Sequence, residues 1–325
     1  MKEPNYLTIN LIFDCLFKVD LFYKALFSLL LLQTSFALAQ DQVYHLIDQK
    51  TREPVPYANI AVIGKTIGTS SDQKGSFSLP KGCEPTDQLK ISAVGFEELS
   101  LSVTDLKSTI GLKEALYELP EVKVRPGVEN KVYRVGGKFN EDISCYWRCG
   151  KEPFIIAKYF EKPVETREYP FLDGIYFFAK VRKRPVSISI RICLPDSSGK
   201  PGTPLHQSPL VFQLKKGRSE RFISLRELHL KIPAAGCFIG IEWLLLPENR
   251  VTEIATLSGT NEKIVHVSYE PNIGVMAGEP ATTIGFRYSK GAWMDMAPLP
   301  SQLEALTRYV KGQSAVPAIQ LQLGN

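Results

Sequence analysis

The chain has 325 residues, of which 44% are hydrophobic and 22% charged, and its formal net charge at pH 7 is +5. This length allows two domains of common size, and the balanced composition excludes a disordered chain. Lysine and arginine cluster only in K-V-R-K-R at Lys180–Arg184, whereas nucleic-acid-binding proteins spread basic side chains over a whole face. We therefore predict a solvated loop there and no nucleic-acid partner, the alternative being contact with an anionic surface.

Residues 1–39 have the pattern of a secretory signal peptide. Lys18 and Lys24 precede the apolar run Ala25–Leu32, and Ala37–Ala39 offers the small residues of a cleavage site. A membrane anchor is the alternative, but the uninterrupted apolar run is shorter than the roughly 20 residues that a spanning helix needs. We expect cleavage at the end of this segment, an exported chain and no transmembrane span in the mature protein.

The stretch Ile47–Leu79 predicts β-strands separated by tight turns. Val55–Ile63 is rich in β-branched residues, which favour strands. Asp72–Gly75 reverses the chain, because aspartate bonds its own downstream backbone and glycine takes a positive φ without penalty. Phe77 and Leu79 then alternate with serines, as in a strand with one apolar face. Further strands are predicted at Lys90–Val94, Glu98–Val103 and Glu121–Val124, whereas Leu112–Leu119 fits either a short helix or another strand.

Three segments of this region resemble the carboxypeptidase regulatory-like domain. They are T-x-E-P-V-P-Y-A-N-I at Thr51–Ile60, G-T-S-S-D-x-x-G-x-F-x-L at Gly68–Leu79 and I-S-A-V-G-F at Ile91–Phe96. The resemblance covers residues 41–125, so we place the domain at 40–125, and it implies a seven-strand transthyretin-like (Ig-like) β-sandwich. In that family the module is a non-catalytic attachment on exported envelope proteins of Gram-negative bacteria. The resemblance therefore implies a fold and a location in the periplasm, outer membrane or cell surface, without implying a reaction.

Residues 126–151 read as a linker or long connection, with Pro126-Gly127 and Gly136-Gly137 as breakers. Within it, Cys145 and Cys149 are spaced to close a small disulfide loop in an oxidising compartment. Half of a metal site is the weaker alternative, because no second Cys or His pair lies nearby. The other mature cysteines make the count odd, which leaves the pairing open; they are Cys83, Cys193 and Cys237.

Residues 152–325 predict a second all-β domain, an antiparallel β-sandwich or jelly roll. Val186–Cys193 alternates apolar and polar residues, and Leu194–Leu205 consists of turn-forming residues. A capping-box pattern at Ser301–Glu304, followed by apolar residues at helical spacing, predicts one short helix. The segments Ile190–Leu205 and Gly236–Leu244 resemble a β domain of uncharacterised role that follows the same module in other exported proteins. Other strands are predicted at Phe154–Phe160, Gly174–Ala179, Leu210–Leu214, Glu220–Ser224, Cys237–Leu246, Ile264–Tyr269, Thr283–Tyr288 and Ala318–Leu323.

No motif for catalysis is present. The histidines are far apart, without an H-E-x-x-H pattern, and no G-x-S-x-G elbow occurs; they are His45, His206, His229 and His266. The turn at Asp196 lacks the further carboxylates of a calcium loop. We expect no catalytic residue, no metal and no cofactor. The alternative is a hydrolase whose site is assembled from distant residues such as His206, Asp196 and Glu242.

Tryptophans are the binding candidates. Trp243 lies in the apolar run I-G-I-E-W-L-L-L, which predicts a core position. Trp147 and Trp293 lie among turn residues and are predicted to be more exposed, where an aromatic face can stack on a ligand. We therefore expect a non-enzymatic binding or interaction module for a protein or a glycan at the cell envelope. The sequence leaves the oligomeric state open.

Overall fold

The computed structural model describes residues 42–115, 131–136, 139, 143, 145–182, 184–256, 262–278, 284–296 and 314–325. The predicted signal peptide at 1–39, the strand at Glu121–Val124 and the helix at Ser301–Glu304 lie outside these residues. Regular structure in the described part is almost entirely β, as predicted. Its helices are single 3-10 turns, namely η1 (Val103–Asp105), η2 (Val164–Arg167), η3 (Arg226–Leu228) and η4 (Pro247–Asn249). None of the helices in that part has the length and apolarity to cross a bilayer.

The first sandwich consists of a three-stranded and a four-stranded sheet, so the described residues supply the seven strands expected. Leu46, Ile60 and Leu89 are fully buried between the sheets. Asp72 forms the predicted turn, since its Oδ1 accepts hydrogen bonds of 2.8 Å from the backbone N–H groups of Lys74 and Ser76. The sheet orders are β4-β1-β7 and β3-β2-β5-β6, with β1 (Val43–Asp48), β2 (Asn59–Val62), β3 (Gly68–Ser70), β4 (Ser76–Ser78), β5 (Gln88–Ser92), β6 (Leu99–Ser102) and β7 (Thr109–Leu112).

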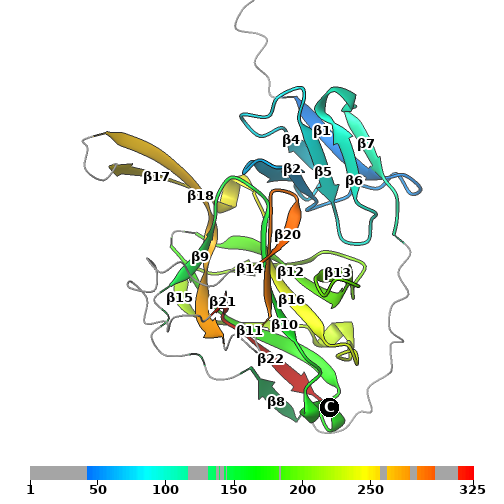
Figure 1. Ribbon diagram of the computed structural model, residues 1–325, viewed down its shortest axis with the longest axis vertical. Coiled ribbons are helices and arrows are strands. Elements are labelled where there is room, and N and C mark those ends of the chain that lie inside the picture. Colours follow the sequence, from blue (N-terminus) through cyan, green and yellow to red (C-terminus); the bar gives the residue numbers. More distant parts are fainter. Residues whose placement is uncertain are drawn as a thin grey trace, which may run out of the picture. The chain divides into compact units, whose positions relative to one another are not determined.

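The second sandwich packs a seven-stranded sheet against an eight-stranded one (Figure 1). The seven-stranded sheet has the order β13-β12-β16-β10-β19-β20, with β14 on β12; its strands are β10 (Phe154–Phe160), β12 (Val186–Pro195), β13 (Pro201–Pro204), β14 (Leu210–Leu214), β16 (Cys237–Trp243), β19 (Gly285–Ser289) and β20 (Ala292–Asp295). Alternating isoleucines of β12 and β16 fill the core, together with Trp243, which is fully buried as predicted.

The eight-stranded sheet includes segments that the sequence did not predict as strands. Its central order is β17-β18-β11-β22-β8, with β15 on β11 and with β9 and β21 on β18. Its strands are β8 (Val132–Val135), β9 (Tyr146–Cys149), β11 (Phe171–Val181), β15 (Gly217–Ser224), β17 (Arg250–Thr256), β18 (Lys263–Gly278), β21 (Ser314–Pro317) and β22 (Ile319–Gly324).

Two predictions of irregular structure are wrong. Residues 126–151 are not simply a linker, because β8 and β9 lie within them and pair with β22 and β18 of the second sandwich. Residues Leu194–Leu205 are not all turn, because β13 pairs back onto the end of β12. The Pro and Gly residues of β13 suggested a break, but the edge position of β13 in its sheet tolerates them. In residues 126–151 the Pro and Gly residues lie outside β8 and β9.

A two-stranded ribbon extends from the second sandwich (Figure 1). We use the name ribbon for β17 and residues 263–269 of β18, which pair with each other from Arg250↔Tyr269 to Thr256↔Lys263. Beyond residue 269, β18 continues into the body, where it pairs with β9, β11 and β21. The ribbon is thus an extension of a core strand.

Candidate binding site at the base of the ribbon

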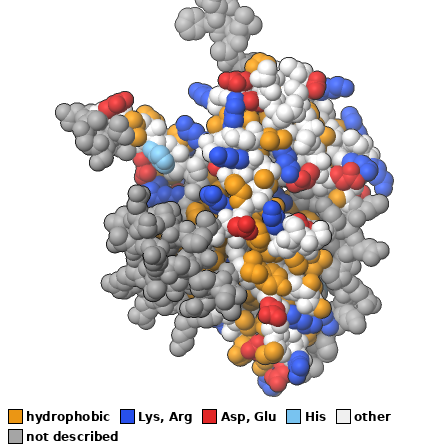
Figure 2. Space-filling model, in the orientation of Figure 1, with side chains coloured by type: hydrophobic (Ala, Val, Ile, Leu, Met, Phe, Trp, Pro, Cys, Tyr) orange, Lys and Arg blue, Asp and Glu red, His pale blue; other side chains and the backbone are white. Residues whose placement is uncertain are grey.

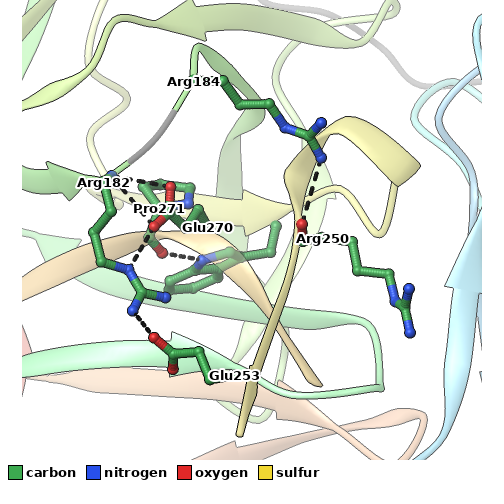
Figure 3. Close-up of polar contacts among 7 residues, drawn as sticks. Arg182, Arg184, Arg250, Glu253, Glu270 and Pro271 are labelled. Atoms are coloured by element: carbon green, nitrogen blue, oxygen red, sulfur yellow. Dashed lines mark hydrogen bonds and ion pairs between the residues drawn. The ribbon is translucent and has the colours of Figure 1, made fainter. Parts of the chain in front are cut away.

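A pocket of about 240 Å³ lies where the ribbon joins the body, and Figure 3 shows three of its lining residues, Arg184, Arg250 and Glu270. Its walls come from the chain segment after β11, from η4, from β17 and from Glu270, which follows the ribbon on β18. The residues that line it are Arg184, Glu248, Arg250, Val251, Thr252 and Glu270.

Arg182 ties the end of β11 to both strands of the ribbon (Figure 3). Its Nε donates to Oε1 of Glu270 at 2.7 Å, its backbone N–H donates to Oε2 of the same residue at 3.0 Å, and its Nη1 donates to Glu253. Burial opposes the charge of Arg182, but these hydrogen bonds outweigh burial and raise its pKa. The hydrogen bond from Arg182 in turn lowers the pKa of Glu253. Glu270 is only 1% exposed. Its hydrogen bonds with Arg182 therefore fix the geometry of the ribbon base.

Arg184 forms another wall of the pocket by holding η4. Its Nε donates to the carbonyl of Glu248 at 2.5 Å, and its Nη2 donates to the carbonyl of Pro247 at 2.8 Å. The prediction of a solvated loop at Lys180–Arg184 is therefore wrong for Arg182 and only partly right for Arg184, which stays exposed. The guanidinium of Arg182 holds two carboxylate side chains, and that of Arg184 holds backbone carbonyls.

Three side chains of the pocket are left for a ligand. Arg250, Glu248 and Thr252 form no side-chain hydrogen bond or ion pair with any other residue that the structure describes. Tyr269 stands directly across the ribbon from Arg250. Thr252 adds a hydroxyl to the charged groups of Arg250 and Glu248. The pocket therefore offers donors, acceptors and a hydroxyl side by side.

His206, one of the residues of the alternative hydrolase, is held on both ring nitrogens by backbone groups. Its Nε2 accepts a hydrogen bond from the backbone of Ile192, and its Nδ1 donates to the carbonyl of Ser208 at 2.8 Å. Burial lowers the pKa of His206 to about 4, so the ring is neutral at pH 7. The other histidines lie elsewhere, with His45 in β1, His229 after η3 and His266 in the ribbon.

Asp196 and Glu242 are also engaged in structural contacts. Oδ1 of Asp196 accepts from the backbone N–H groups of Ser198 and Lys200 and so closes its own turn. The carboxylate of Glu242 is fully buried and pairs with Arg191, with Nε–Oε2 at 2.7 Å and Nη2–Oε1 at 2.8 Å. Among the residues described, no group of three or more His, Cys, Asp or Glu side chains is arranged to hold a metal ion.

The buried pair of Arg191 and Glu242 also joins the two sandwiches. The side-chain amide of Asn59, on β2 of the first sandwich, donates to Oε1 of Glu242. Nearby, Ser70 Oγ accepts from the backbone N–H of Leu245 at 3.0 Å. Residues 43–325 form one compact unit, and we call these contacts the junction.

Trp147 and Trp293 are half-buried and pack inside the protein. Trp147, on β9, lies against the main core with its ring centroid 6.0 Å from that of Phe154. Trp293, on β20, packs edge-on against Tyr288 at 5.5 Å. The two tryptophans belong to different sheets, so the structure does not bring them together as one platform, and neither lines the pocket.

The described cysteines are all free thiols, namely Cys83, Cys145, Cys149, Cys193 and Cys237. The interpretation of Cys145 and Cys149 as a small disulfide loop is wrong. Extended β9 lies between them, and four residues of strand span about 13 Å, whereas a disulfide needs Cα atoms within about 7 Å.

Comparison with known families identifies the first sandwich. The model of the CarboxypepD_reg-like domain family matches residues 45–124. Residues 45–124 are a CarboxypepD_reg-like domain. This confirms the resemblance drawn from the sequence, and the seven strands of the CarboxypepD_reg-like domain account for its matched motifs. The pocket and the ribbon lie outside the matched residues.

Two further comparisons add little. No curated protein matches the chain. Among solved structures, one titled as the structure of infectious bursal disease virus, Gx strain, is 9% identical over 87% of this chain, with a TM-score of 0.22. This chain covers 63% of the length of that viral chain. At such a score the likeness carries no argument about fold or function.

The residues that line the pocket were not predicted from the sequence. R-V-T-E-I-A-T at Arg250–Thr256 alternates polar and β-branched residues, and this signal could have predicted β17. No sequence signal pairs Arg182 with Glu253, 71 positions away. That contact depends on the ribbon folding back beside the end of β11.

Proposed function

We propose that this chain is a non-catalytic exported protein of the cell envelope that binds a protein or glycan partner at the pocket below the ribbon. The CarboxypepD_reg-like domain, an Ig-like binding fold, supports a binding role. The signal-like pattern of residues 1–39 supports export, and the resemblance of the first sandwich to modules of exported envelope proteins supports a place in the periplasm or at the surface of a Gram-negative bacterium.

The observation that carries the proposal is the set of unengaged polar side chains on a fixed frame. Arg250, Glu248 and Thr252 face a pocket of about 240 Å³, while Arg182 and Arg184 hold its walls. The frame that carries these groups is fixed before a ligand binds, so only the side chains have to be ordered on binding. By contrast, the candidate catalytic side chains each serve a structural contact.

The binding test compares the wild-type chain with Arg250→Ala. We expect wild type to retain a partner from envelope extract or to give a signal on a glycan array, and Arg250→Ala to lose that signal. Lys107→Ala removes an exposed charge on the first sandwich, distant in sequence, and serves as the matched control. If wild type gives no signal in either assay, or if both variants bind equally well, the pocket is not the binding site.

Two separate assays address compartment and chemistry. Fractionation with N-terminal sequencing should find the mature chain outside the cytoplasm, beginning at Gln40. A hydrolytic activity of the purified chain that is abolished by His206→Ala in a folded variant would contradict the non-catalytic role.

A further inference from the structure

The ribbon has two faces of different character. Side chains alternate between them along each strand. We define the outward face as four residues of β17 and their cross-strand partners on β18, namely Arg250, Thr252, Ile254, Thr256, Lys263, Val265, Val267 and Tyr269. At its base the inward face carries Glu253, held by Arg182, and the buried residues Val251 and Ser268. The body of the protein therefore anchors the base of the ribbon, whereas both Ile254 of the outward face and Ile264 of the inward face are exposed farther out.

The middle of the outward face is apolar, where a solvent-facing strand pair is normally polar. Ile254 and Val265 are cross-strand partners and are 72% and 64% exposed. Val267, which is half-buried, continues the apolar stripe toward the base, where Tyr269 packs against the main core. Figure 2 shows hydrophobic side chains at the surface of the ribbon. Exposed apolar stripes of this kind mark interaction surfaces.

The edges of the ribbon are also open. In the described part of the chain, β17 pairs with β18 alone, and β9 reaches β18 only from Tyr269 onward. The outer half of each strand therefore presents backbone N–H and C=O groups without a strand beside them. Such an edge can accept an added strand from another chain.

Charge indicates what the added strand carries. Arg250 lies at the base of the outward face and Lys263 at its far end, and none of the eight residues of this face is acidic. We propose that the ribbon docks an extended segment of a partner protein, with alternating apolar residues and acidic residues at its flanks. The open edge pairs with the partner backbone, the apolar stripe packs on alternate side chains, and the basic ends meet the acids.

The same charges argue against two other occupants. If the outward face packed on a second copy, Arg250 and Lys263 would meet each other or themselves in either orientation, and like charges repel. A bilayer would require apolar residues at the far end, but that end carries Lys263 and Thr256. The apolar stripe is also only one ribbon wide and runs along its length, which fits a single strand.

The test measures binding of two synthetic peptides to the full chain. Both alternate valine and threonine; one is flanked by glutamates and the other by lysines. We expect the glutamate-flanked peptide to bind at least about tenfold more tightly. Combining Ile254→Thr with Val265→Thr keeps β-branched side chains in both strands and should abolish this binding. Lys263→Glu should reduce or reverse the preference between the peptides.

The controls separate docking from folding and from the other occupants. Val43→Thr alters an exposed valine of the first sandwich (48% exposed) and should leave binding unchanged. Equal binding of both peptides, or full binding by a folded Ile254→Thr/Val265→Thr variant, would overturn the proposal. It would also be overturned if that variant instead lost binding to vesicles of equimolar phosphatidylcholine and phosphatidylglycerol, or lost self-association. Ile254, Lys263 and Val265 do not line the pocket. These variants therefore test the ribbon proposal independently of the proposed binding at the pocket.

Discussion

Lys158 is a charged residue placed in the core of the second sandwich. It lies on β10 between Ile156 and Phe160, which both belong to the main core, and it is only 8% exposed. Its Nζ donates to the carbonyl of Ile319 at 3.2 Å and lies 5.0 Å from the ring centroid of Phe160. Burial lowers the pKa of Lys158 to about 8, so the charged amine destabilises the fold at neutral pH.

We predict that Lys158→Met stabilises the protein at pH 7, because a shift of the pKa from 10.5 to about 8 corresponds to on the order of 3 kcal/mol. The folded pKa lies below the unfolded one, so the unfolded state binds more protons between these values and wild-type stability rises with pH there. The advantage of the variant should be full below pH 8 and vanish near pH 10.5. Urea unfolding across this range measures it. Lys162→Met, at an exposed position, should show no such pH-dependent difference.

Glu242 and Arg191 form an ion pair in which the Glu242 side chain is fully buried and the Arg191 side chain is 11% exposed. We expect Glu242→Gln to lower the free energy of unfolding by about 3–5 kcal/mol, because Arg191 then stays buried without its counter-charge. Replacing both residues with methionine should be much milder, since no buried charge remains. Denaturant unfolding of the single and double variants makes the comparison. A single variant as stable as the double would show that the pair is not desolvated.

The stability of the ribbon depends on Arg182. A two-stranded ribbon is at best marginally stable by itself, and Arg182 connects β11 to Glu253 of β17 and to Glu270, the residue of β18 that follows the ribbon. We predict that Arg182→Ala speeds hydrogen exchange throughout β17 and residues 263–269 of β18. The seven-stranded sheet should remain protected.

Arg218→Ala serves as the comparison for this exchange experiment, because Arg218 also contacts neighbouring segments but lies on β15, away from the ribbon. It should leave ribbon exchange unchanged. Unchanged exchange in Arg182→Ala would mean that the ribbon is held by its backbone pairing with the body alone.

The whole molecule depends on close contact at the junction. The backbone N–H of Gly68 donates to the carbonyl of Lys151 at 2.8 Å, and a Cβ at Gly68 would lie 2.3 Å from Cδ of Pro153 and 2.5 Å from the carbonyl oxygen of Ile60. Only glycine fits there. We predict that Gly68→Ala lowers stability by about 1–3 kcal/mol through overpacking and separates the unfolding of the two sandwiches.

Calorimetry tests this prediction directly. Wild type should unfold in one transition and Gly68→Ala in two. Gly150→Ala is the matched control, because a Cβ there meets no atom within 4 Å. A single, unshifted transition in Gly68→Ala would show that the junction does not couple the sandwiches.

The sequence by itself determined the all-β class, the CarboxypepD_reg-like domain and most strands of both sandwiches. The reason is that these features depend on residues close together in the sequence. Alternation in β12 places its isoleucines in the core, and the aspartate and glycine of Asp72–Gly75 form a turn without help from distant residues. Trp243 was predicted as core on the same local basis.

Only the tertiary structure decided where charges meet. Arg182 with Glu253 and Glu270, and Asn59 with Arg191 and Glu242, are pairs distant in sequence whose partners are chosen by strand order and sheet packing. For the same reason, the sequence could not predict β8 and β9 or the exposure of Ile254. An alternating pattern shows that a strand has two faces, but the surrounding fold decides which of them faces solvent.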